Sequence, residues 1–265
     1  TIDIFDNELN NELFKSEPKT LSNKGKILVT FKNIENNEIH IDKYKNYFNR
    51  IGEIDAYISI ITLVKEFKDK QYNICYTRYE TNVTPSFRLK DLWHPYLAKN
   101  NNYNEITSNS IEIGGTNNPN NIILTGPNAG GKSTFIKAVS LSLLFSQTLG
   151  ISFSKESYIT PMTLINTYLN IPDCKNKESL FEAEMHRARN HLNKLKELGE
   201  YDFSFIVMDE IFSSTNPEEG ISGAYAICNK LAEYKNSISL ITTHFSYLTK
   251  LGDDIIIEPP APLPP

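Results

Sequence analysis

Along the second half of the chain, short apolar runs alternate with segments in which apolar positions recur at helical spacing. Short apolar runs typical of buried strands lie at 121–125 (NIILT), 203–210 (FSFIVMDE) and 237–244 (SISLITTH). Segments with helical spacing separate these runs, at about 132–148, at 179–199 and after Pro217. Strands that alternate with helices predict an α/β fold with a central, mostly parallel sheet flanked by helices.

The first hundred residues follow a different pattern. Residues 24–34 (KGKILVTFKNI) mix β-branched and aromatic side chains, which predicts a short strand. Residues 51–67 repeat apolar positions at helical spacing, which predicts a helix with one apolar face. That face comprises Ile51, Ile54, Ile58, Ile61 and Val64. Asparagine-rich loops around a strand at 110–114 then lead into the α/β part, so a small, mainly helical segment precedes it.

Composition narrows the class of protein. With 265 residues, 40% of them hydrophobic, the chain is long enough for one large domain with an appendage. The formal net charge of −5 provides no overall basic field, so any DNA contact must come from a local patch or from other segments. Three scattered cysteines without a CxxC pair argue against a disulfide framework and a structural zinc site, and favour a reducing, intracellular compartment. No apolar run approaches the ~20 residues that span a membrane, and the polar start is unlike a signal peptide.

A glycine-rich loop follows the first strand of the α/β part and precedes a helix. It matches the pattern G-x-x-x-x-G-K-[ST] through the residues Gly126, Pro127, Asn128, Ala129, Gly130, Gly131, Lys132 and Ser133. In such a loop, backbone N–H groups converge on phosphate oxygens, and the N-terminus of the following helix favours negative charge. Lys132 would neutralise the β- and γ-phosphates and Ser133 would offer its hydroxyl to Mg²⁺, which predicts a nucleotide site.

Two carboxylates come at the end of the strand at 203–210. Ligands gather at the carboxyl ends of strands in open α/β sheets, so Asp209 is placed to hold a metal ion, directly or through water. Glu210, one position on, is the candidate group to orient or deprotonate an attacking water. His244 ends the next apolar strand, where it would sense or stabilise the γ-phosphate, although a lone histidine at a strand end is often an ordinary surface residue.

The helix at 179–199 begins at a serine with Glu182 three residues on, which is the spacing of a capping box. Ser179 would place a hydroxyl and helix N-terminal amides at a tip that suits an anion; the alternative is a helix that is merely capped. His186 and His191 are five residues apart on this helix, so they do not face one another as a metal-binding pair would.

Four motifs in this order resemble the ATPase domain of the MutS mismatch-repair proteins. They are TGPNAGGKST at 125–134, S-x-F-x-x-E-M at 179–185, VMDE at 207–210 and TTHF at 242–245. His94-Pro95 resembles the His-Pro that precedes the nucleotide site of that family, and 51–60 resembles the segment that joins its lever helices to the ATPase. The resemblance covers 121–250 and extends, less closely, over 51–120.

The resemblance implies a P-loop NTPase of ABC-ATPase type that uses ATP and Mg²⁺. It implies that phosphates and metal are held by Asn128, Gly131, Lys132, Ser133 and Thr134. Asp209 would support Mg²⁺, and Glu210 and His244 would serve hydrolysis. Ile106 is the match for a residue that packs on the adenine in the family.

The resemblance also implies partners. The ATPase would form a homodimer or heterodimer with sites shared across the interface, and Ser179 would reach the γ-phosphate of the ATP bound by the partner subunit. ATP binding and hydrolysis would be coupled to clamping, sliding and release of DNA, a mismatched or otherwise distorted duplex held largely by domains outside this chain. We therefore divide the chain into a connector or lever-base segment at 1–90, the ATPase domain at 91–258 and a disordered tail at 259–265.

The sequence departs from the family pattern at several points. Ala129 replaces a bulky residue, and Trp93 stands where a basic residue commonly precedes His-Pro. SSTNPEEG at 213–220 replaces a glycine- and threonine-rich segment at the expected dimer interface. The Phe-x-Glu motif that reads mismatches in the family does not occur in these 265 residues, and 1–50 is too short for a mismatch-binding domain. We therefore expect a fragment or a divergent branch of the family.

Other functions stay open at this stage. A nucleotide-binding subunit of a transporter would share the phosphate loop, acidic strand and histidine, but it would need an LSGGQ-like helix tip, which SLFEAEM at 179–185 lacks. A nucleotide-gated scaffold would bind ATP and scarcely hydrolyse it, which the presence of Glu210 and His244 argues against. A MutS-like paralogue that acts in recombination or another DNA transaction would keep all four motifs.

Overall fold

The computed structural model describes residues 21–35, 38–99, 106–127, 130–168 and 180–252. The chain divides into two compact units, Thr1–Leu63 and Val64–Pro265. Within the described ranges, none of the helices is both long enough and apolar enough to cross a membrane.

The first unit is helical where it is described. It contains α2 (Leu21–Glu35) and most of α3 (Glu38–Asp69). The strand predicted at 24–34 is wrong, because that segment lies within α2. β-Branched residues favour strands where they pack on a half-buried, pleated surface, whereas Leu28 and Val29 are 70% and 58% exposed on their helix.

The helix predicted at 51–67 is confirmed as part of α3, and its apolar face is mostly exposed. The exposed side chains, each 58–60% accessible, are Ile51, Ile54, Ile58 and Ile61. Val64 is buried and begins the second unit. There the Phe67 ring meets the Trp93 ring edge to face at 5.3 Å, so the last turns of α3 are anchored in the second unit.

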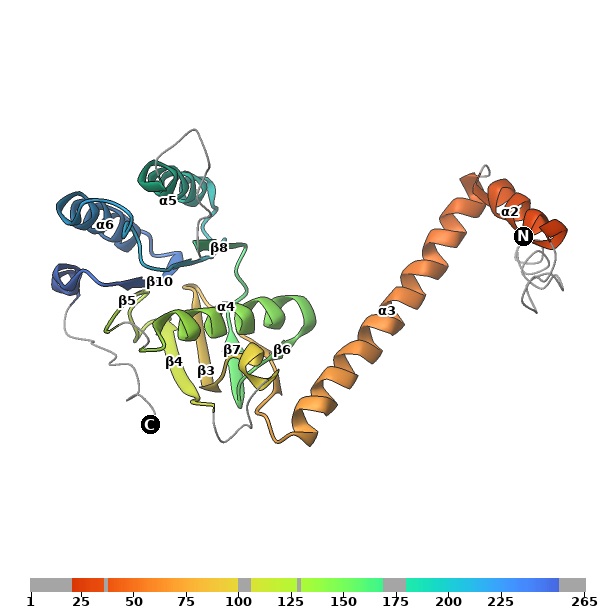
Figure 1. Cartoon of the computed structure of the whole chain (residues 1–265), viewed down its shortest axis with the longest axis horizontal. Helices are drawn as coiled ribbons and strands as arrows, with labels where there is room; N and C mark the ends of the chain where they lie inside the picture. The colour runs from red at the N-terminus through yellow and green to blue at the C-terminus, as the bar shows by residue number, and fades with distance from the viewer. Residues whose placement is uncertain (1–20, 36–37, 100–105, 128–129, 169–179, 253–265) are drawn as a thin grey trace. The chain divides into compact units, whose positions relative to one another are not determined.

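The described part of the second unit contains two four-stranded sheets and one short strand pair (Figure 1). The first sheet is parallel throughout, in the order β5 (Asn121–Thr125), β10 (Ser237–Thr243), β9 (Ser204–Met208) and β8 (Leu164–Tyr168). The second sheet runs in the order β2 (Arg78–Tyr79), β7 (Glu156–Ile159), β3 (Ser86–Leu92) and β4 (Asn109–Gly114). In the short pair, the strands are β1 (Cys75–Tyr76) and β6 (Ile151–Ser152).

Helices lie on both faces of the parallel sheet. They are α4 (Lys132–Leu149), α5 (Leu180–Glu197) and α6 (Pro217–Ala232). The described part of this unit also contains the short 3₁₀ helices η2 (Pro95–Lys99) and η4 (Ser246–Leu251). Alternate side chains of β9 belong to opposite faces of the sheet. Phe205 and Val207 pack with α4 and the second sheet, whereas Ile206 and Met208 pack with α5 and α6. The predicted α/β class, with a parallel sheet flanked by helices, is confirmed.

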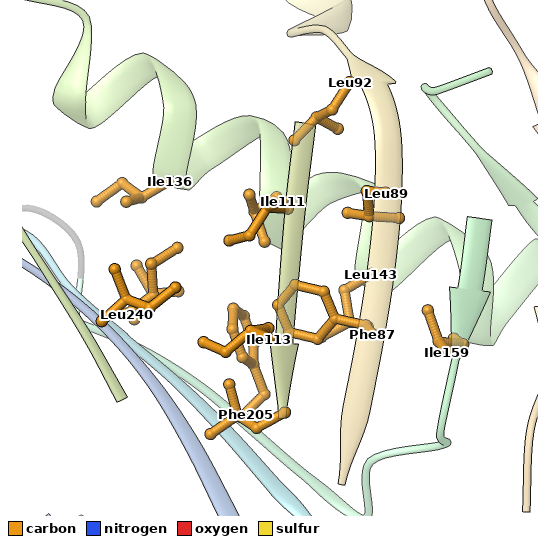
Figure 2. Packing of buried hydrophobic residues seen from close by; sticks show 14 of the residues in the cluster. Phe87, Leu89, Leu92, Ile111, Ile113, Ile136, Leu143, Ile159, Phe205 and Leu240 are labelled. Atoms are coloured by element: carbon orange, nitrogen blue, oxygen red, sulfur yellow. The ribbon is translucent and has the colours of Figure 1, made fainter. Parts of the chain in front are cut away.

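The larger core lies between the two sheets and α4, as Figure 2 shows. Its labelled side chains are Phe87, Leu89, Leu92, Ile111, Ile113, Ile136, Leu143, Ile159, Phe205 and Leu240. The Phe87 ring of β3 and the Phe205 ring of β9 meet edge to face at 5.5 Å. Burying each such side chain contributes about 1.5–3 kcal/mol, so this core holds the strands of the parallel sheet firmly against α4.

The predicted boundary between 1–90 and 91–258 stays a prediction. β3 (Ser86–Leu92) spans that position and pairs with both β4 and β7. Strand pairing therefore runs across the point where the character of the sequence changes. The tail predicted at 259–265 lies outside the described residues.

Candidate functional site

Three motifs that are far apart in the sequence meet at one edge of the parallel sheet. β5, β10 and β9 are parallel neighbours, so their carboxyl ends lie side by side. Gly126 follows β5, Asp209 follows β9 and His244 follows β10. This edge is where open α/β sheets bind ligands.

The loop between β5 and α4 leaves the start of α4 open toward this edge. Gly131 is the N-cap residue of α4, in a left-handed conformation with φ of 81°, and no side chain caps the helix. Glycine adopts that conformation without steric cost, whereas a side chain there would be strained. The uncapped N-terminal amides of α4 and the helix dipole together favour an anion at this position.

Lys132 is buried at the first position of α4. Its Nζ donates hydrogen bonds of 2.8 Å to the Gly126 carbonyl and 3.0 Å to the Pro127 carbonyl. An ammonium group has three donors, so these bonds tie the loop to the helix while one donor is left over for a ligand.

Ser133 and Asp209 bring the glycine loop and the acidic strand into contact. Ser133 Oγ donates a hydrogen bond of 3.0 Å to Asp209 Oδ1. Thr242 Oγ1 donates a second bond of 2.6 Å to the same carboxylate oxygen. Thr242 lies in the motif TTHF, but its contact with Asp209 could not be predicted from the sequence, because only the pairing of β10 with β9 brings this hydroxyl to Asp209.

Glu210 and His244 form a pair beside Asp209. His244 Nε2 lies 2.8 Å from Glu210 Oε1, and both side chains are partly exposed. The Glu210 backbone has a φ of 53°, a left-handed conformation that residues other than glycine adopt rarely. The Glu210 N–H donates to Thr242 Oγ1 at 2.8 Å, and the Ser213 N–H donates to the Glu210 carbonyl at 3.2 Å. These bonds stabilise the turn that presents the Glu210 carboxylate.

The loop after Glu210 is anchored by Phe212. Its backbone is also left-handed, with φ of 56°, and its side chain is buried. The Phe212 ring meets the Phe181 ring of α5 edge to face at 5.4 Å. A Cβ atom on Gly220 of α6 would lie 2.6 Å from the Phe212 carbonyl oxygen, so only glycine allows this close approach of helix and loop.

A buried hydrogen bond joins α5 to the same loop. Ser214 Oγ donates to Glu184 Oε2 at 2.9 Å, and the Glu184 side chain is buried. Burial raises the pKa of the Glu184 carboxyl, and the hydrogen bond from Ser214 opposes that rise in part. This contact could not be predicted from the sequence, because the two residues lie in different segments and their spacing gives no sign that they meet.

Tyr168, the last residue of β8, adjoins both Glu184 and the acidic turn. Its carbonyl accepts a hydrogen bond of 3.1 Å from the Asp209 N–H. Burial, together with the nearby Glu184 carboxyl, raises the pKa of the Tyr168 phenol well above its usual range, so the phenol stays neutral. The residue thus connects α5, β8 and Asp209.

The two histidines of α5 differ in exposure, since His186 is exposed and His191 is buried. His191 is buried and its Nδ1 lies 3.1 Å from Asn166 Nδ2 of β8. Burial, and to a lesser extent the Lys194 charge, lowers the pKa of His191 to about 4, so the ring is neutral at pH 7. Among the residues that the structure describes, no group of three or more His, Cys, Asp or Glu side chains could hold a metal ion.

The structure describes some of the remaining predicted site residues but not others. Asn128, Ala129 and Ser179 lie outside the described residues. Ile106 is buried three residues before β4, and Thr134 is exposed in the first turn of α4. The roles predicted for all of these residues stay predictions.

Comparison with known proteins places the chain in a family. Residues 122–256 match the family model described as MutS domain V. The chain is 28% identical over 210 residues to the DNA mismatch repair protein MutS of Syntrophomonas wolfei, covering 79% of this chain and 24% of that protein. It is 32% identical over 171 residues to MutS protein homolog 4 of Mus musculus, covering 63% of this chain and 17% of that protein. The chain thus spans no more than about a quarter of the length of these relatives, and it belongs to the MutS family.

Proposed function

We propose that the residues at the carboxyl edge of the parallel sheet form an ABC-type P-loop site that binds and hydrolyses ATP. The observation that carries the proposal is the hydrogen bond of 3.0 Å between Ser133 Oγ and Asp209 Oδ1, which joins the glycine loop to the acidic strand. In P-loop ATPases a hydroxyl and a carboxylate at these two places share one metal ion. The match to MutS domain V, the ATPase domain of MutS proteins, supports the same activity.

Phosphate binding in this proposal depends on the start of α4. The uncapped amides of the helix and the loop that precedes it receive the phosphate oxygens, and the helix dipole favours their negative charge. Lys132, held by the Gly126 and Pro127 carbonyls, directs its remaining donor to the β- and γ-phosphates.

Ser133 and Asp209 fit a magnesium ion. Mg²⁺ prefers oxygen ligands and is usually held by one or two protein groups together with substrate phosphates, which is what a serine hydroxyl and one carboxylate offer. When bound, the ion would neutralise charge that develops on the phosphate oxygens. Asp209 is held in place for this role by two hydroxyl donors, Ser133 and Thr242.

Glu210 is the proposed general base. Its carboxylate would orient the attacking water and accept its proton, and the partial exposure of the side chain leaves room for that water. In the tautomer that carries a hydrogen on Nε2, His244 would donate a hydrogen bond to Glu210 Oε1, which fixes the direction of the carboxylate. The left-handed backbone of Glu210 follows directly on Asp209, so the proposed base and the proposed metal ligand are neighbours in the chain.

Partners are part of the proposal. We infer that the ATPase forms a homodimer or heterodimer, with Ser179 reaching the ATP of the partner subunit, and that its cycle switches DNA-bound states in mismatch repair. One relative is named a DNA mismatch repair protein, which supports this assignment. The net charge of −5 suits a domain whose DNA contacts are made largely by other parts of a longer protein.

Replacing Lys132 tests nucleotide binding. In Lys132→Ala, the affinity for a fluorescent ATP analogue should fall by roughly 10- to 100-fold, because the phosphates lose a charged hydrogen-bond donor in a buried position. Lys196→Ala removes an exposed lysine near the end of α5 and should bind the analogue like the wild type. Equal affinity of Lys132→Ala and wild type would remove the basis for a phosphate site at this loop.

Replacing Ser179 tests the dimer. Ser179→Ala should keep ATP affinity within about twofold but weaken ATP-driven association roughly tenfold, since one hydrogen bond to a charged phosphate is lost across the interface. Sedimentation velocity with and without ATP measures the association. Thr148→Ala, which removes an exposed hydroxyl near the end of α4, is the control. If Ser179→Ala associates as wild type does, Ser179 has no role across the interface.

A further inference from the structure

One buried hydroxyl links the two carboxylate-bearing residues of the site. Thr242 Oγ1 donates a hydrogen bond of 2.6 Å to Asp209 Oδ1 and accepts one of 2.8 Å from the Glu210 N–H. The Thr242 side chain is fully buried. A hydroxyl supplies one donor and two acceptor lone pairs, so the two bonds are compatible with each other.

Strand register brings Thr242 to this position. The pairing of β10 with β9 ends at Ile241 opposite Met208, so Thr242 lies where β9 gives way to Asp209. Side chains two residues apart on a strand share a face, so Thr242 lies on the same side as Leu240, which packs in the core with α4. Ser133 in the first turn of α4 approaches Asp209 Oδ1 as well.

The Glu210 backbone depends on this hydroxyl for its amide hydrogen bond. β9 ends at Met208 and the Glu210 backbone, with φ of 53°, is not in a strand conformation, so the Glu210 N–H lies beyond the ladder of β9. It is donated instead to Thr242 Oγ1, while the Glu210 carbonyl accepts from the Ser213 N–H. Thr242 therefore stabilises the turn that directs Glu210 and also donates a hydrogen bond to the Asp209 carboxylate.

We propose that Thr242 is a positioning residue, which sets the Asp209 carboxylate and the Glu210 turn relative to each other through one hydroxyl. The inference rests on the proposed ATPase function and deepens it. Without the hydroxyl, the partly buried N–H of Glu210 loses its acceptor and Asp209 Oδ1 loses one of its two donors. Metal-dependent binding of ATP, through Asp209, and activation of water, through Glu210, should then weaken together.

Thr242→Val is the direct test, because valine keeps the branched shape of threonine and lacks the hydroxyl. We expect its kcat for ATP to fall about 10- to 100-fold, which corresponds to the loss of one hydrogen bond to a charged group. The Mg²⁺ concentration that half-maximally tightens binding of a fluorescent ATP analogue should rise roughly tenfold. In EDTA, where Asp209 has no metal to hold, the affinity for the analogue should change less than about twofold.

Two further variants separate positioning from a general loss of structure. Thr242→Ser restores the hydroxyl and should return kcat and the Mg²⁺ midpoint to within about threefold of wild type. Ser237→Ala removes another buried hydroxyl of β10, at the opposite end of the strand, where it lies 2.9 Å from Ser204 Oγ. This control should leave the Mg²⁺ midpoint unchanged, even where thermal unfolding shows a loss of stability.

The proposal is overturned if Thr242→Val keeps kcat and the Mg²⁺ midpoint within about twofold of wild type, or if Thr242→Ser is as impaired as Thr242→Val. A loss of affinity in EDTA equal to the loss in Mg²⁺ also overturns it, since that pattern means a general structural defect. If wild-type protein binds ATP with Mg²⁺ but does not hydrolyse it, the ATPase assignment fails. The Mg²⁺ midpoints of the three Thr242 proteins then still decide whether Thr242 positions Asp209.

Discussion

Glu210→Gln should lower the rate of ATP hydrolysis by about 10²- to 10⁴-fold, because a glutamine amide cannot accept the proton of the attacking water. The variant keeps the size of the side chain and one oxygen that can still face His244 Nε2. In the wild type that nitrogen lies 2.8 Å from Glu210 Oε1. The backbone turn, with its bonds to Thr242 and Ser213, does not involve the side chain. The affinity for ATP should therefore change by less than about threefold.

Steady-state hydrolysis and equilibrium binding of a fluorescent ATP analogue measure these two effects separately. Glu200→Gln is the matched control, since it neutralises an exposed glutamate in the loop between α5 and β9 and should leave both quantities unchanged. Hydrolysis by Glu210→Gln at the wild-type rate would show that another group activates the water. It would also remove the reason for placing catalysis at this turn, and the scaffold function would then be favoured.

Phe212→Ala should lower the free energy of unfolding by about 3–5 kcal/mol, the usual cost of deleting a buried phenylalanine ring. The ring is fully buried and contacts Phe181 of α5 at 5.4 Å. Alanine and phenylalanine are both strained at a φ of 56°, so the change isolates the loss of packing. Since the ring anchors the loop that begins at Glu210, turnover by the folded fraction should fall as well.

Chemical denaturation of the wild type and variant measures this loss of stability. Tyr247→Ala, which truncates an aromatic side chain that is 49% exposed on η4, should cost less than about 1 kcal/mol. An equal effect of the two substitutions would mean that the loop after Glu210 is not anchored through Phe212. It would also leave unexplained why Gly220 of α6 approaches the Phe212 carbonyl so closely.

Much of the α/β part could be predicted from local patterns. The strand at 121–125, the helix that starts at Lys132, and the strands that end before Asp209 and His244 all occur where the apolar runs predict them. Each run is long enough and apolar enough to be buried, and its period distinguishes strand from helix. Since ligands gather at the carboxyl ends of parallel strands, the same patterns indicated where the site would form.

Local patterns failed where packing decides. Residues 24–34 contain β-branched and aromatic side chains, yet they form part of α2. The strand preference of such residues depends on a neighbouring strand and a surface to pack against, neither of which is written in the segment itself. The positive φ values of Glu210 and Phe212 could not be predicted either, because neither residue is a glycine.

By itself, the sequence determined the α/β class, the glycine loop, the two carboxylates and the order of the motifs, because these depend on residue type and on spacing within one element. Only the tertiary structure decided which polar groups meet. Thr242 reaches Asp209 through strand register, and Ser214 reaches Glu184 through the packing of α5 on a loop 30 residues away. Such contacts depend on the relative placement of distant elements, which is set by burial of the two cores rather than by any local pattern.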